Sequence, residues 1–152
     1  MKKTVSLVLV LSMIAVAVIG FGTAANAQTL SSTEKALSLI NTFATGDADM
    51  ARSLLAEDYI QHNLAYGTGA DAFVGSVEYL ASAEVKTTVN NIRAFEDGDK
   101  VFLQTVYNFA GAGEQVAFDI FRIDENGKIA EHWDVMETIA DPSTWQNQNG
   151  KF

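Results

Sequence analysis

Residues 129–135 read Ile-Ala-Glu-His-Trp-Asp-Val and place an imidazole and two carboxylates in a stretch typical of a β-strand. Side chains alternate across a strand, so His132 and Asp134 share one face, together with Ala130 and Met136. The opposite face would carry Ile129, Glu131, Trp133 and Val135. A histidine and a carboxylate on a core-facing side are costly to bury unless they are paired or open into a pocket. The pattern therefore predicts a site at His132 and Asp134.

Asp119 extends this candidate site from a second strand, expected at residues 115–123. Pairing through the turn at 124–127 puts Asp119 and Phe121 on the face of His132 and Asp134, provided that no bulge shifts the register. Two carboxylates and an imidazole on one concave face could perform general acid–base catalysis. The alternative is structural, with Asp119 at a rim and Asp134 paired to His132 or to the backbone.

Two further segments supply candidate pocket residues. In the extended segment 59–63, Gln61 and Asn63 face one way and His62 the other. His62 is a candidate proton acceptor or a structural loop contact, and Asn63 could hold a carbonyl. In the strand expected at 100–109, Gln104 lies on the face opposite to Tyr107, and the sequence does not decide which face lines a pocket.

Several reaction classes are disfavoured by what the sequence lacks. It has no cysteine, no glycine-rich phosphate loop after a strand and no G-x-S-x-G motif. Its two histidines, His62 and His132, have no metal-ligand spacing, so we expect no metal and no cofactor.

The amino-terminal residues are typical of a secretory signal peptide. Lys2 and Lys3 precede an apolar run at 5–21, and Ala-Asn-Ala at 25–27 forms a small-x-small cleavage site. The alternative is a retained membrane anchor. We expect residues 1–27 to be removed and residues 28–152 to form a single secreted or periplasmic domain without membrane contact after cleavage.

Charge and surface pattern constrain the partners. The net charge is −9, which argues against nucleic acid and anionic lipid as ligands. A small molecule in a pocket is the expected partner. The outer strand face carries Trp133 and Val135, which need to be covered, so a homodimer is also expected.

The order of elements predicts an α+β fold. Ser31 and Glu34 form a capping-box pattern before a helix that ends at Gly46, Asp47 could cap a second helix, and 71–81 is helical in its periodicity. Residues 85–95, 100–109, 115–123 and 128–138 are then expected as antiparallel strands joined by hairpin turns. A curved sheet against a helical layer would leave a pocket between them.

The closing stretch 119–135 and the segment Tyr-Ile-Gln-His-Asn at 59–63 resemble the SnoaL-like polyketide cyclase family, within the nuclear-transport-factor-like superfamily. The resemblance implies a cone-shaped, curved antiparallel sheet wrapped around about three N-terminal helices and enclosing a pocket. It also implies Asp134 as general acid/base, Asp119 as a neighbouring pocket position, and Asn63 where related epoxide hydrolases keep an amide. The strand at 102–108 lacks the Arg/Asp pair that those hydrolases require.

Three functional hypotheses follow. In the first, a lyase or isomerase of the aldol type uses Asp134 to move a proton beside a substrate carbonyl, while His132 or His62 tunes it and Asn63 or Gln104 orients the oxygen. In the second, the pocket of an exported, non-catalytic protein binds a small apolar ligand. In the third, the chain is a dimeric scaffold with a vestigial pocket.

Overall fold

The computed structural model describes residues 30–152, and its first half is helical. The helices are α1 (Ser32–Thr45), α2 (Ala48–Leu54) and α3 (Ala70–Ser82). The expected capping box is confirmed: Ser31 Oγ accepts from the Glu34 N–H, and the Glu34 carboxylate accepts from the Ser31 N–H. Gly46 ends α1 with φ +74°, a left-handed conformation that favours glycine.

Five strands form one sheet in the order β1-β5-β4-β3-β2. Their bounds are β1 Leu55–Gln61, β2 Thr88–Asp97, β3 Lys100–Asn108, β4 Gln115–Ile123 and β5 Ile129–Thr138. Short 3₁₀ turns occur at Phe109–Gly111 and Pro142–Thr144. The hairpin strands β2 to β5 pair antiparallel as expected, whereas β1 pairs parallel to β5. The sheet is therefore mixed, because β1 comes from the helical half of the chain.

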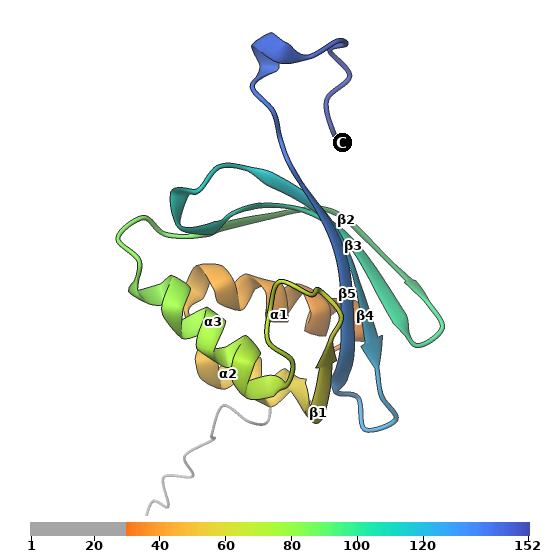
Figure 1. Cartoon of the computed structure of the whole chain (residues 1–152). Coiled ribbons are helices and arrows are strands. Elements are labelled where there is room, and N and C mark those ends of the chain that lie inside the picture. Colours follow the sequence, from red (N-terminus) through yellow and green to blue (C-terminus); the bar gives the residue numbers. More distant parts are fainter. Residues whose placement is uncertain (1–29) are drawn as a thin grey trace, which may run out of the picture.

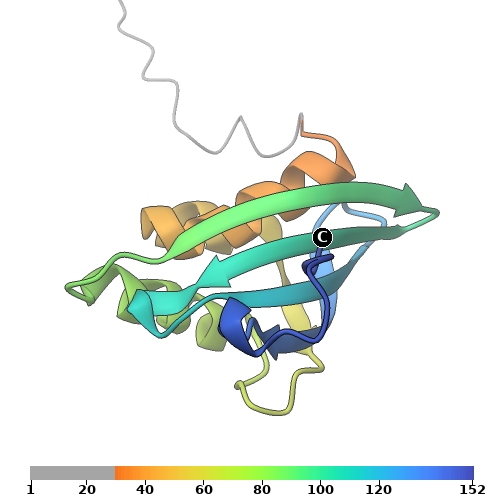
Figure 2. The same cartoon turned by 90° about the horizontal axis from the view of Figure 1, so that it is seen from above.

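The helices lie against the concave face of the curved sheet, as Figure 1 shows. Apolar side chains from both layers fill the space between them, and Leu39, Leu54, Val77 and Phe121 are at most 1 % exposed. The view from above shows the long strands curving past the helices (Figure 2). This α+β arrangement confirms the expected fold class and leaves room for a pocket at one end of the core.

The register of β4 against β5 decides which side chains face the helices. Asp119 lies opposite Asp134, and Phe121 lies opposite His132. The pairing then slips by one residue, since Arg122 pairs with Glu131 but Ile123 pairs with Ile129. This bulge turns Ile129 into the core, where it is 0 % exposed, and corrects the expectation that Ile129 shares the outer face with Glu131.

The carboxyl-terminal end of the chain contacts the outer face of the sheet through Lys151. The Gln104 amide nitrogen donates to the Lys151 carbonyl oxygen at 3.0 Å, and Lys151 forms an ion pair with Glu137. Figure 1 shows the segment after β5 extending away from the sheet before its end turns back toward it. Gln104 is buried on this outer face, on the side opposite to the helices. The expectation that Gln104 contacts a ligand in the pocket is therefore corrected, because side-chain alternation along β3 turns Gln104 away from the helices.

Among residues 30–152, no helix combines the length and apolarity needed to span a bilayer. The signal-peptide prediction for residues 1–27 lies outside the described residues.

Candidate functional site

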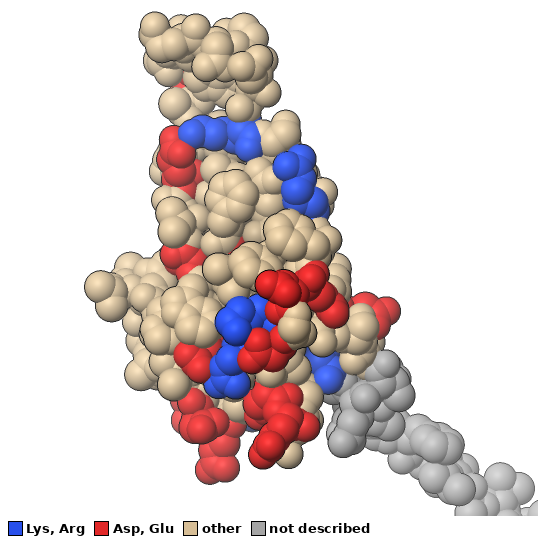
Figure 3. All heavy atoms as spheres, turned by 90° about the vertical axis from the view of Figure 1, so that its right-hand side faces the viewer, with Lys and Arg blue, Asp and Glu red and all other residues tan. Residues whose placement is uncertain are grey.

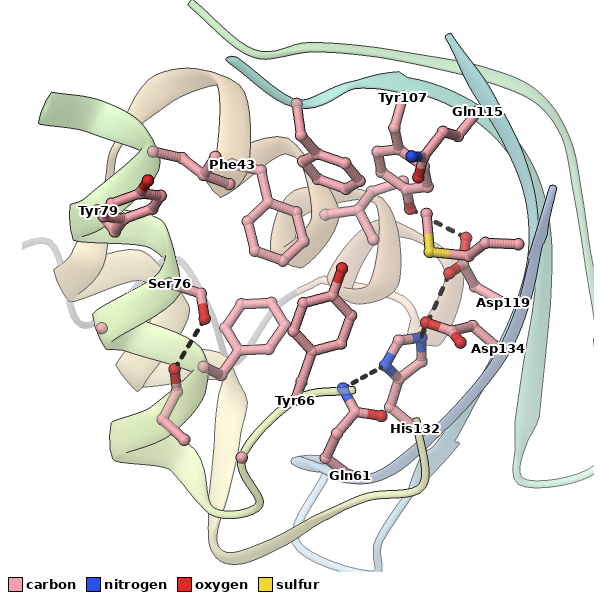
Figure 4. A pocket seen from close by; sticks show the side chains of 18 of the residues that line it. Phe43, Gln61, Tyr66, Ser76, Tyr79, Tyr107, Gln115, Asp119, His132 and Asp134 are labelled. Atoms are coloured by element: carbon pink, nitrogen blue, oxygen red, sulfur yellow. Dashed lines mark hydrogen bonds and ion pairs between the residues drawn. The ribbon is translucent and has the colours of Figure 1, made fainter. Parts of the chain in front are cut away.

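A pocket of about 440 Å³ lies between the helices and the inner face of the sheet. Its walls are mainly apolar and aromatic, contributed by Ile40, Phe43, Phe73, Leu80, Phe109 and Phe121. Figure 4 shows that the ionisable side chains gather on the sheet side of this space, opposite α3. Such a pocket, apolar with a few convergent polar groups, is the usual form of a small-molecule site.

Asp119, from the middle of β4, is held by two hydrogen-bond donors. The Tyr107 hydroxyl donates to Oδ2 at 2.9 Å, and His132 Nε2 lies 3.3 Å from Oδ1. Burial raises the pKa of Tyr107 far above its usual range, and the Asp119 charge adds to this effect. Tyr107 therefore stays protonated and remains a donor. Both oxygens of the Asp119 side chain are therefore engaged, which holds this side chain in place in the pocket wall.

His132 lies in the pocket wall between the two aspartates, and its side chain is only 8 % exposed. Its ring stacks on Phe121, with 4.4 Å between the ring centres and 7° between the planes. Gln61 Nε2 lies 3.0 Å from His132 Nδ1. The imidazole is therefore held in place on its face and at both ring nitrogens.

Asp134 differs from Asp119 because one of its oxygens is left available. Oδ1 accepts from the Asn63 side-chain amide at 2.6 Å, whereas Oδ2 lies 4.0 Å from His132 Nε2, beyond hydrogen-bond reach. Burial raises the pKa of Asp134, and the nearby Asp119 charge adds to the rise. The Asn63 hydrogen bond opposes it, as would a positive charge on His132. A carboxylate with raised proton affinity and a free oxygen in a pocket is suited to proton transfer.

The structure separates the predicted site residues into two groups. Asp119, His132 and Asp134 converge and, like Phe121, line the pocket, while Asn63 reaches the cluster through its bond to Asp134. His62 does not join them: it is exposed, it stacks on Trp133 with 4.5 Å between ring centres, and it pairs with Glu131. The expectation that His62 acts as a proton acceptor in the pocket is corrected. Side chains alternate along this segment, so His62 faces outward while its neighbour Gln61 faces the pocket.

Three pocket residues were not singled out from the sequence as ligand contacts. Gln61 holds His132, Tyr107 holds Asp119, and Tyr66 lines the cavity from the loop after β1. Alternation along the segment 59–63 put Gln61 on the same face as Asn63, and this could have identified Gln61 as a pocket residue. No sequence pattern could have identified Tyr66, since its position depends on how the glycine loop folds over the cavity (Figure 4).

Within residues 30–152, Asp119, His132 and Asp134 form a set whose ligand atoms lie within 4.8 Å of one another, close enough to surround a metal ion. A metal-bound histidine normally donates its other ring N–H to an acceptor. Here the Gln61 carbonyl oxygen accepts from the Asn63 backbone N–H, so the amide nitrogen faces His132 Nδ1. This contact fits a neutral imidazole that accepts at Nδ1, and it fits acid–base chemistry better than metal binding.

A known protein family matches more than half of the chain. A family model described as the SnoaL-like domain matches residues 36–132. No curated protein sequence matches the chain.

Solved structures with the same fold have low sequence identity. An NTF2-like protein of unknown function from Cytophaga hutchinsonii is 17 % identical over 71 % of this chain and 91 % of its own, with a TM-score of 0.61. An LEH-like epoxide hydrolase from M. tuberculosis is 16 % identical over 70 % and 82 %, with a TM-score of 0.61. IdmH from Streptomyces antibioticus, assigned provisionally as a polyketide cyclase, is 19 % identical over 71 % and 93 %, with a TM-score of 0.57. At these identities the structures show the fold alone.

Proposed function

The chain belongs to the SnoaL-like domain family, and on that premise we propose that it is an acid–base enzyme of the lyase or isomerase type, acting beside a carbonyl group of a small molecule. One observation carries the proposal. Asp134 has a raised pKa and a free Oδ2 in the wall of a largely apolar cavity, next to a buried His132 and a second carboxylate. That arrangement provides a base with little water around it, which strengthens its interaction with a bound substrate.

The proposed reaction begins when Asp134 Oδ2 takes a proton from the carbon next to the substrate carbonyl. The C–H electron pair forms the enolate, whose negative charge develops on the carbonyl oxygen. The Tyr66 hydroxyl points into the cavity in Figure 4 and is the donor that we assign to this oxygen. The enolate carbon then attacks a second carbonyl of the same molecule and Asp134 gives its proton to the oxygen of that carbonyl, or Asp134 returns the proton to another carbon of the enolate. The apolar wall accommodates the remaining carbon skeleton.

Replacement of Asp134 by Asn tests the assignment, because Asn keeps the shape and the acceptor for Asn63 but cannot take a proton. We expect turnover to fall by roughly 10²- to 10⁴-fold, the usual contribution of a positioned general base. The measurement is deuterium exchange beside the carbonyl, followed by NMR over a panel of ketones and β-diketones. Asp99→Asn, at an exposed hairpin position, is the matched control. Equal turnover in Asp134→Asn and wild type would reject Asp134 as the base.

The second candidate is an exported binding protein that holds a small apolar ligand without chemistry. The aromatic lining of the cavity supports this function as well. Native mass spectrometry of protein purified from the exported fraction separates the two, since a stoichiometric, unmodified ligand with no exchange activity supports binding alone.

We also propose secretion or periplasmic localisation after cleavage behind Ala27, on the strength of the signal-peptide pattern. Amino-terminal sequencing of the exported protein should begin at Gln28. A mature chain that retains residues 1–27 would contradict this localisation.

A further inference from the structure

We propose that Gln61 is a positioning residue that fixes the tautomer of His132, placing the single proton of the neutral imidazole on Nε2. The role of this tautomer in catalysis rests on the proposed function, whereas the tautomer itself is a property of the free protein. Gln61 ends β1 and lies beside β5, where its backbone pairs with His132. The two side chains therefore meet in the pocket wall (Figure 4).

The orientation of the Gln61 amide is set by the backbone. Its Oε1 accepts from the backbone N–H of Asn63 at 2.9 Å. A backbone N–H can only donate, so the oxygen must lie on that side and the NH₂ group on the other. Gln61 Nε2 then reaches His132 Nδ1 at 3.0 Å and the Tyr59 hydroxyl at 3.4 Å. All parts of the amide are engaged, which locks its direction.

The proton of His132 follows from that direction. The Gln61 amide can only donate to Nδ1, so Nδ1 is the acceptor and the neutral ring carries its hydrogen on Nε2. This Nε2–H points to Asp119 Oδ1 at 3.3 Å, with Asp134 Oδ2 at 4.0 Å. In the opposite tautomer, a lone pair of Nε2 would face the Asp119 carboxylate and repel it.

The fixed tautomer separates the roles of the two groups. With its N–H turned toward the carboxylates, neutral His132 cannot take the proton that Asp134 has removed from a substrate. Asp134 keeps that proton for the later step, and His132 serves as a donor beside it. Gln61 touches no reacting atom in this scheme and acts through His132.

Nitrogen NMR of wild-type protein labelled with ¹⁵N-histidine tests the inference directly. The chain holds two histidines, so a His62→Asn variant assigns the spectrum. At neutral pH we expect the His132 Nδ1 resonance in the range of an unprotonated nitrogen and Nε2 in the range of a protonated one. The reverse pattern would overturn the proposal without any substitution at Gln61.

Two substitutions at Gln61 then test whether this residue determines the tautomer of His132. Gln61→Met keeps the length but removes the donor, so the Nδ1 resonance should move toward the average of the two tautomers. Gln61→Glu offers an acceptor, so Nδ1 should move into the protonated range. Gln115→Glu is the matched control: Gln115 lines the same pocket from the start of β4, and we expect it to leave the His132 resonances in place. An unchanged Nδ1 in Gln61→Glu would refute the role of Gln61.

Kinetics link the tautomer to turnover. In an active enzyme, Gln61→Met should lower kcat by roughly 10²-fold with little change in KM. An Nε2–H pattern in a protein that turns over no carbonyl substrate would reject the proposed enzyme and leave the tautomer assignment intact. Turnover by a protein with the Nδ1–H pattern would reject the tautomer assignment and leave the proposed enzyme intact.

Discussion

Asp134 is the residue whose charge must change in the proposed reaction, and its environment favours the protonated form. Burial raises its pKa and Asp119 adds to the rise, while the Asn63 hydrogen bond lowers it, as would a positive charge on His132. Only the carboxylate can act as a base. We therefore expect kcat/KM to increase with pH through the pKa of Asp134, with a midpoint above the ordinary value of about 3.9.

Asn63→Leu should move that midpoint to higher pH, because it removes the hydrogen bond that favours the charged carboxylate. A pH profile of kcat/KM for wild type and variant measures the shift. Asn90→Leu, at an exposed position on β2, should leave the midpoint unchanged. A midpoint that moves to lower pH in Asn63→Leu would show that Asn63 does not stabilise the carboxylate.

Strand parity was sufficient to predict that Asp119, His132 and Asp134 share one face. It could not predict which face of β3 meets the helices, so Gln104 remained a candidate ligand contact although it lies on the outer face. His62 illustrates a second limit. Its stacking on Trp133 and its pairing with Glu131 join residues from β5 and the end of β1, and no local pattern encodes such a contact.

At the scale of elements, the junction of α1 with α2 depends on Gly46. Its φ is +74°, and a Cβ at this position would lie 2.7 Å from the Cβ of Ala81 in α3. Gly46→Ala should therefore destabilise the fold by more than about 1 kcal/mol, from strain and from the clash between helices. Gly75→Ala, within α3, meets no atom within 4 Å and should stabilise by about 0.5–1 kcal/mol.

Urea unfolding curves of both glycine variants measure these opposite changes. Equal midpoints would contradict the steric argument at Gly46.

Elements were predicted best where their signals are local. The Ser31 capping box, the Gly46 stop and the hairpin turns follow from residue types a few positions apart. The observed β2 begins at Thr88, later than the expected residue 85, because β-branched composition does not mark where pairing starts. The slip near Ile129 and the parallel pairing of β1 depend on how distant segments pack, so composition and periodicity did not predict them.

At the scale of the whole molecule, the sheet presents an apolar outer face to solvent. Phe118 and Val135 lie opposite each other on β4 and β5 and are 57 % and 74 % exposed. Phe95, 58 % exposed, stacks on Phe102 nearby. Figure 3 shows side chains without charge, several of them aromatic, across the middle of this face between groups of charged residues. An exposed apolar patch of this kind is typical of a protein–protein interface.

We propose that a second copy of the chain covers this patch, because a two-fold contact would bury the same apolar side chains on both protomers. Val135→Lys should then convert a dimer into a monomer, since it would bury an unpaired charge at the interface. Sedimentation equilibrium at micromolar concentration measures the mass of each form. Leu64→Lys removes an apolar side chain that is even more exposed, at 99 %, from the loop after β1, away from the sheet face, and should leave the dimer intact. A wild-type protein that sediments as a monomer would contradict this assembly, and the cluster around Asp134 would then have to function within a single chain.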